Sequence, residues 1–287
     1  MPLVSYSQLR LYQTCPRKYE YAFVKKITRP ISPGESFGSS MHNTLKKWGD
    51  LEMEAAAAKE PSLQEQTMMF AADKTPLAAD ALSEQTMVAL WHQNFIVDSY
   101  ATRVEADFAR KRGERMMHYF YDWWRGACPP KLDLSGVALA KTEERRWDPR
   151  QVIAVEKGFT LHADGLALTG RFDRVESMGE GVRVIDFKTG AIRHQTEVDA
   201  DLQLSVYALA AAETFKKPCA ELSLLFISEE GVTEHRTTRN EQQLRDALTQ
   251  IRLLTERMAS RDYHPTPSFA KCSVCPYRRI CDASASP

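Results

Sequence analysis

The stretch GRFDRVESMGEGVRVIDFKTG, residues 170–190, contains two short runs of alternating apolar residues separated by the turn sequence MGEG at 178–181. This pattern is typical of a β-hairpin. Asp173 lies in the first run, and Asp186 and Lys188 lie in the second. Because residues two apart in a strand point to the same face, Asp186 and Lys188 should lie side by side. The stretch therefore predicts a hairpin that displays two carboxylates and an amine.

Two carboxylates and a lysine on one hairpin could serve phosphodiester chemistry. Mg²⁺ takes oxygen ligands, often one or two carboxylates together with phosphate oxygens, and it can activate a water molecule. Lys188 could orient or deprotonate that water, or neutralise charge in the transition state. An Asp-x-Lys sequence is also an ordinary charge pattern on an exposed strand. These three residues alone therefore do not identify an enzyme.

The net charge of the chain neither indicates nor excludes a nucleic-acid partner. Its 287 residues include 38 Lys and Arg and 38 Asp and Glu, so no global basic field indicates a nucleic-acid partner. Local basic clusters near 17–29, 110–115 and 278–279 permit DNA binding without arguing strongly for it. No apolar run is long enough to span a membrane, and no secretory signal follows Met1. We therefore expect a cytoplasmic protein with no membrane partner.

The N-terminal part of the chain predicts helices. Residues 4–24 have apolar residues at helical spacing, and Pro16 divides them into two short helices that meet at Cys15. Residues 38–40 lead into a further helix, with His42 near its first turn. Residues 50–126 are rich in Ala and Met and predict several helices in an insertion or subdomain, in a chain long enough for one large domain or two small ones. The aromatic residues near its end could stack on bases, but core packing is favoured; they are Tyr119, Phe120, Trp123 and Trp124.

The C-terminal half alternates strands and helices. Residues 137–149 and 152–176 read as strands, with turns at Asp148-Pro149 and Asp164-Gly165. A helix over 198–214 places Gln203 and Tyr207, four residues apart, on one stripe. A strand over 221–229 and a helix over 241–260 follow. The alternation predicts an α/β fold.

The cysteines near the end of the chain have the spacing of metal ligands. Cys272 and Cys275 form a C-x-x-C pair, and Cys281 follows six residues later. Three cysteines lack a fourth ligand, and Cys15, which also precedes a proline in the same way as Cys275, is the best candidate to supply it. In a cytosolic protein a disulfide framework is not expected. Two further cysteines, Cys128 and Cys219, lack ligand spacing and are interpreted as inert.

Taken together, these motifs resemble the PD-(D/E)XK nuclease superfamily, in particular RecB- and AddB-type nuclease domains and the CRISPR adaptation nucleases. The matching segments, in order, are CPRKYEYAFV from Cys15, FGSSMH ending at His42, GRFDRVE around Asp173, VIDFKTG around Asp186 and Lys188, QLSVYALA with Gln203 and Tyr207, and CSVCPYRRIC at the end. The resemblance covers the chain apart from the region of about 50–150. It implies a single nuclease domain over 1–287 with a restriction-endonuclease-like core, a central mixed β-sheet flanked by helices.

The resemblance also implies roles for these residues. The divalent metal, Mg²⁺ or Mn²⁺, would be bound by His42, Asp173, Asp186 and the backbone carbonyl of Phe187. Lys188 would serve the attacking water, and Gln203 and Tyr207 would complete the catalytic set. A 4Fe-4S cluster held by Cys15, Cys272, Cys275 and Cys281 would join the segments 1–30 and 265–287.

The implied function is metal-dependent hydrolysis of DNA by an exonuclease, on single strands or at DNA ends, in repair or recombination. The sequence carries no helicase signature such as G-x-x-x-x-G-K-[ST], so a helicase or recombination subunit would be a separate protein. Two alternatives remain open. One is a non-catalytic DNA-binding or scaffold subunit of a recombination or CRISPR adaptation complex. The other is an adaptor stapled by zinc, because four cysteines also suit that metal.

Overall fold

A long central strand, β3 (Leu166–Met178), organises the sheet of the computed structural model, which describes residues 3–59, 79–126, 151–163 and 165–286. β2 (Val152–Ala163) pairs antiparallel along one edge of β3. Along the other edge β3 pairs with β4 (Gly181–Lys188) and, in parallel, with β1 (Val4–Ser5). The expected hairpin is thereby confirmed, and Gly179 occupies its turn with φ +57°, a conformation that favours glycine.

Two further strands make the sheet mixed. β5 (Cys219–Ser228) lies parallel to β4, and β6 (Gly231–Thr237) returns antiparallel to β5. The crossover from β4 to β5 runs through α6 (Gln195–Asp199) and α7 (Leu202–Phe215). The described strands therefore form a six-stranded mixed sheet flanked by helices, as a restriction-endonuclease-like α/β core requires.

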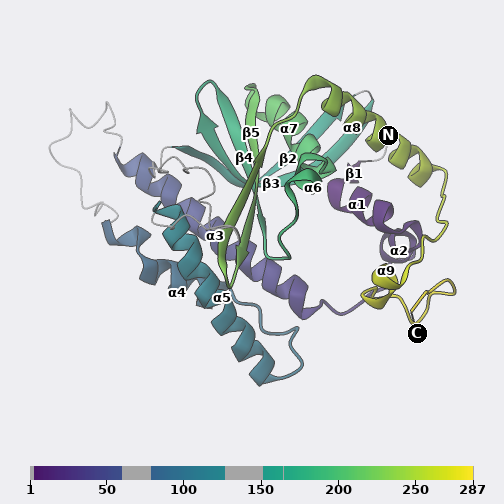
Figure 1. Cartoon of the computed structure of the whole chain (residues 1–287), viewed down its shortest axis with the longest axis horizontal. Helices are drawn as coiled ribbons and strands as arrows, with labels where there is room; N and C mark the ends of the chain where they lie inside the picture. The colour runs from purple at the N-terminus through teal and green to yellow at the C-terminus, as the bar shows by residue number, and fades with distance from the viewer. Residues whose placement is uncertain (1–2, 60–78, 127–150, 164, 287) are drawn as a thin grey trace, which may run out of the picture.

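Helices cover both faces of this sheet (Figure 1). On one face α1 (Tyr6–Thr14), α7 and α8 (Glu241–Ala259) share a core with Val182 and Val184 of β4. On the other face α3 (Pro33–Lys59), α4 (Glu84–Asn94) and α5 (Arg103–Trp124) share a core with Ile185 and Phe187 of β4. Because successive side chains of β4 point to opposite faces of the sheet, this strand contributes to both cores.

The segment that follows α1 lies beside the C-terminal segment. After α1 come α2 (Pro16–Tyr19) and a single π-helical turn, η1 (Glu20–Val24), and the C-terminal segment contains α9 (Phe269–Ser273). The Thr266 hydroxyl donates a 3.1 Å hydrogen bond to the Thr14 carbonyl, and the Tyr277 hydroxyl donates a 3.2 Å bond to the Ile27 carbonyl. These bonds join segments that are about 250 residues apart.

Buried charges tie α3 to the sheet. Arg174 on β3 bonds both carboxylate oxygens of Glu52 on α3 and also pairs with Glu176 at 2.8 Å. The Trp124 indole of α5 donates to the same Glu52 at 2.6 Å. All three side chains of the ion-paired set are buried. Because α3 also carries His42, this network fixes that helix against the strand next to Asp173.

Several sequence predictions need correction. His42 lies in the third turn of α3 rather than near the first, because the helix begins at Pro33, where Ser32 and Glu35 satisfy the free backbone groups. The helix expected over 198–214 begins at Leu202, where the Asp201 side chain accepts from the first free N–H groups. Strand β6 was not predicted from its sequence.

Other predictions fall partly outside the described residues. The expected strand at 137–149 and the turn at Asp148-Pro149 lie there, as does the part of the expected insertion at 60–78. The described parts of 50–126 are α-helical, apart from the 3-10 turn η3 (Ala79–Leu82) and connecting turns. No described helix is both long enough and apolar enough to cross a bilayer.

Candidate functional site

The expected site residues gather where β3 and β4 separate. The two strands pair from the turn as far as Arg174 and Ile185, and the pairing ends there. Beyond that point a side-chain hydrogen bond takes the place of backbone pairing between the strands: the Phe187 N–H donates to Asp173 Oδ2 at 2.8 Å. In an antiparallel edge the N–H and C=O of one residue face the same neighbour. The Phe187 carbonyl therefore faces the Asp173 side of β4, as its expected role as a ligand requires.

Helix α3 brings His42 to Asp173. His42 Nδ1 lies 3.5 Å from Asp173 Oδ2 and 3.5 Å from Oε1 of Glu156, a residue of β2. Burial lowers the pKa of His42, but hydrogen bonding to Asp173 and Glu156 outweighs burial and raises it to about 10. Among the described residues, these three form a group whose ligand atoms all lie within 4.8 Å of one another, so they could hold a metal ion.

The second acid of the hairpin lies in a separate network. Lys188 Nζ is 2.5 Å from Asp186 Oδ2 and donates to Gln203 Oε1 at 3.2 Å. Gln203 Nε2 and the Tyr207 hydroxyl both donate to Asp186 Oδ1, at 3.0 and 3.1 Å. Gln203 and Tyr207 are also bonded to each other at 2.8 Å. Helix α7 therefore holds both the acid and the amine in fixed positions.

The environment of Asp186 suits a cation. The side chain is 2% exposed, and burial raises its pKa although Lys188 opposes that effect. Within the described part of the chain, the buried Asp186 Oδ2 accepts no well-aligned hydrogen bond, although it forms an ion pair with the Lys188 ammonium. A buried carboxylate oxygen without such a bond is costly, and a divalent ion would remove that cost. The donor set of oxygens and one imidazole nitrogen fits Mg²⁺ or Mn²⁺.

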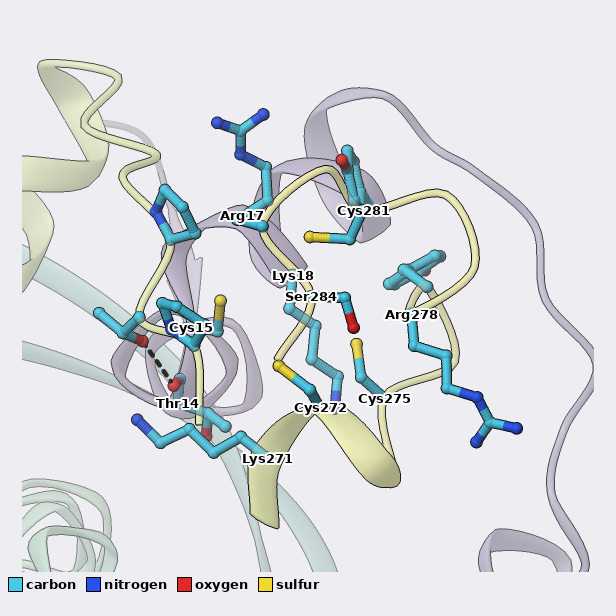
Figure 2. A pocket seen from close by; sticks show the side chains of 16 residues that line it. Thr14, Cys15, Arg17, Lys18, Lys271, Cys272, Cys275, Arg278, Cys281 and Ser284 are labelled. Carbon is cyan, nitrogen blue, oxygen red and sulfur yellow. Dashed lines mark hydrogen bonds between the residues drawn. The ribbon is translucent and has the colours of Figure 1, made fainter. Parts of the chain in front are cut away.

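The four expected cysteine ligands line one pocket between the chain ends (Figure 2). Cys15 caps α2, Cys272 lies in α9, and Cys275 and Cys281 lie in the turns that follow. Burial raises the pKa of Cys15, but backbone N–H groups of Thr266 and Lys18 outweigh burial and lower it. Among the described residues, no three of these sulfurs form a group within 4.8 Å. Basic side chains share the lining: Arg17, Lys18, Lys271 and Arg278.

Residues expected to be structural behave as such where they are described. Burial raises the pKa of Cys219 to about 12, which makes its thiol unreactive, whereas Cys128 lies outside the described residues. Of the aromatic residues on α5, Phe120 and Trp124 are buried in the core, but Tyr119 is exposed.

Glu156 was missed from the sequence. The sequence did contain a signal for it, because a two-residue Asp164-Gly165 turn fixes the register of the strands on either side. Counting back from that turn places Glu156 opposite Asp173. The register of the strands agrees, since Val155 pairs with Arg174 and Lys157 pairs with Phe172.

Comparison with known proteins supports one family. The model of the PD-(D/E)XK nuclease superfamily matches residues 3–282. The Gene 69 protein of Mycobacterium phage L5 is 25% identical over 296 residues, which cover 98% of this chain and 96% of the phage protein. The Gene 69 protein of Mycobacterium phage D29 is also 25% identical, over 301 residues that cover 98% and 97%.

The structural comparison is weaker. A candidate exonuclease from Eubacterium rectale has a TM-score of 0.35 and 11% identity, covering 71% of this chain and 83% of that one. At that score it adds no argument about function, and the assignment rests on the family model. Since that model spans nearly the whole chain, the protein belongs to the PD-(D/E)XK nuclease superfamily.

Proposed function

We propose that this nuclease is a metal-dependent DNA exonuclease that hydrolyses phosphodiester bonds on single strands or at DNA ends, with a role in repair or recombination. The observation that supports this most is the site at the divergence of β3 and β4. There His42 lies 3.5 Å from Asp173, the Phe187 N–H donates to Asp173, and Lys188 lies 2.5 Å from Asp186, so α3, β3 and β4 each contribute contacts. A scaffold that had lost activity would have no need for these fixed contacts.

The residues would divide the work as follows. His42, Asp173, Asp186 and the Phe187 carbonyl would hold Mg²⁺ or Mn²⁺, which polarises the scissile phosphate and lowers the pKa of a water molecule. Lys188 would hold that water by its ammonium and balance charge in the transition state. Gln203 and Tyr207 do not need to touch DNA, because their bonds to Asp186 and Lys188 already position those two side chains.

The cysteines would hold a 4Fe-4S cluster as a structural staple. A single zinc ion with bonds of about 2.3 Å would require sulfurs roughly 3.8 Å apart. What supports a cofactor that joins the N- and C-terminal segments is that all four cysteines line one pocket. A group bound at both ends of the chain would close almost the entire sequence into one loop and stabilise the fold. It would also bring Arg17 and Lys18 together with Arg278 as one basic surface for DNA.

A digestion assay tests this function. The purified full-length protein is incubated with Mg²⁺ or Mn²⁺ and four DNAs: linear single-stranded, circular single-stranded, linear duplex and duplex with both ends blocked. We expect loss of the linear substrates and protection of the circular and end-blocked ones, with all cleavage abolished by EDTA. Equal cleavage of circular and linear DNA would contradict an exonuclease, and absence of cleavage with either metal would contradict an enzyme.

A further inference from the structure

Glu156 on β2 is in direct contact with the pair His42 and Asp173. Its Oε1 lies 3.5 Å from His42 Nδ1, and its side chain is only 13% exposed. The register places it opposite Asp173 across the antiparallel pair β2–β3. Two like charges opposite each other across strands destabilise a sheet. His42 lies against both carboxylates, and a cation bound by all three side chains would offset the repulsion between the two acids.

The spacing of the three ligand atoms fits one ion. His42 Nδ1 is 3.5 Å from each carboxylate, and all three atoms lie within 4.8 Å of one another. An octahedral cation with bonds of about 2.1 Å separates adjacent ligands by about 3.0 Å and opposite ones by about 4.2 Å. Small side-chain adjustments would therefore let all three bind one cation. Asp186, the other carboxylate proposed above as a ligand, lies outside this group of three atoms.

The backbone at Glu156 also departs from an ordinary strand. Its φ is +45°, in the left-handed region that costs a residue with a side chain roughly 1–2 kcal/mol. A strained residue of this kind persists only where its surroundings require it, and such residues concentrate at functional sites. Among the described residues, Glu156 also pairs with Arg171, whose side chain is 67% exposed and lies 3.3 Å from Glu156 Oε2. An exposed ion pair of that type contributes little stability, so it does not account for the strain.

We propose that Glu156 is a further carboxylate ligand of the divalent cation, alongside His42 and Asp173. This inference rests on the proposed metal-dependent function and adds a residue to it. A third carboxylate near the ion raises the negative charge of the site. Affinity for a hard divalent cation rises with that charge. The site with Glu156 should therefore bind Mn²⁺ more tightly than the same site without this carboxylate.

Binding of Mn²⁺ without DNA tests the proposal independently of catalysis. Full-length protein is freed of divalent ions with EDTA and dialysed, and free Mn²⁺ is then measured by its EPR signal during a titration. We expect Glu156→Gln to weaken binding about tenfold or more, since loss of even an outer-shell partner costs 10–100-fold. Its melting temperature in EDTA is measured in parallel, and Mn²⁺ binding is compared at a temperature at which both proteins are folded. A dissociation constant within about twofold of the parent would overturn the proposal.

Two controls separate a bond to the metal from a general field effect. Arg171→Gln removes the other partner of Glu156 and should not weaken Mn²⁺ binding; a loss as large as that of Glu156→Gln would assign Glu156 to Arg171 instead. The titrations are repeated in 1 M KCl, where the screening length is about 3 Å. The loss of Mn²⁺ affinity caused by Glu156→Gln should persist at that salt concentration. If the loss disappears, Glu156 acts on the ion only through long-range charge and is not a ligand.

The failure of this inference can be told from failure of the proposed function. If Asp173→Asn weakens Mn²⁺ binding but Glu156→Gln does not, only the role of Glu156 is wrong. If the parent protein binds no Mn²⁺, both the inference and the proposed metal-dependent function are wrong.

Discussion

Replacing Glu52 with Gln should destabilise the protein more than any surface change on the same helix. Glu52 is fully buried, and its carboxylate is bonded by Arg174 and by the Trp124 indole. Removing one charge of a buried ion pair leaves the other uncompensated and costs about 3–5 kcal/mol. Glu176 still pairs with Arg174 in the variant, so we expect the lower end, about 3 kcal/mol. At about 2 °C per kcal/mol for a chain of this size, the melting temperature should fall by about 6 °C.

The same substitution should also weaken the affinity of the proposed metal site for Mn²⁺. Glu52 fixes α3 to β3, and these two elements carry His42 and Asp173. Thermal unfolding monitored by circular dichroism gives the stability, and Mn²⁺ titration of metal-free protein gives the affinity. Glu54→Gln, an exposed change on α3, is the matched control. A melting temperature for Glu52→Gln within about 2 °C of the control would refute this reasoning, since that corresponds to only about 1 kcal/mol.

Three further predictions concern the cysteine pocket, DNA binding and the helical layer. The proposed 4Fe-4S cluster predicts that anaerobically purified protein is brown. Cys281→Ser should remove that colour and lower the melting temperature, whereas Cys219→Ser should keep the colour; a colourless Cys281→Ser protein that melts like the parent would rule out a structural staple. DNA affinity measured by anisotropy in EDTA should fall at least about tenfold between 50 and 200 mM KCl, because phosphate contacts dominate binding; affinity that does not change with salt would contradict this. Gly113→Ala should lower the stability by roughly 1–3 kcal/mol in urea unfolding, because its Cβ would lie 1.9 Å from a Trp91 ring atom; an unchanged midpoint would show that α4 and α5 can separate freely.

The hairpin could be predicted from the sequence because its signals are local. The turn sequence fixes the register of β3 and β4, and alternation along the strands decides which side chains share a face. The same signals place Lys188 beside Asp186 and predict the α7 stripe that bonds them both. Local sequence patterns therefore predict the part of the site that is formed by β4 and α7.

The rest of the site depends on packing between distant elements. The position of His42 follows from how far α3 extends before it meets the sheet, and that start is set by a cap at Ser32 rather than by the apolar pattern. The role of the Glu52–Arg174 pair requires contact across 122 residues, which no local pattern reveals. Glu156 was accessible through the register, but its strained backbone was not, since a Glu in a strand does not indicate positive φ.

Cleavage by a Lys188→Ala variant tests the central claim most directly. Lys188 lies on the same strand as Asp186 and contacts it and Gln203, but it is 22% exposed, so its removal should leave the fold intact. Lys217→Ala, an exposed change after α7, is the matched control.

The measurement is the initial rate of digestion of end-labelled single-stranded DNA with saturating Mg²⁺ or Mn²⁺, on variants whose melting temperatures match the parent. Loss of an interaction that stabilises the transition state by several kcal/mol corresponds to about a thousandfold or more in rate. We expect that loss for Lys188→Ala and parental rates for Lys217→Ala. A Lys188→Ala protein that digests DNA at near-parental, EDTA-sensitive rates would contradict the assignment of this hairpin as the active site.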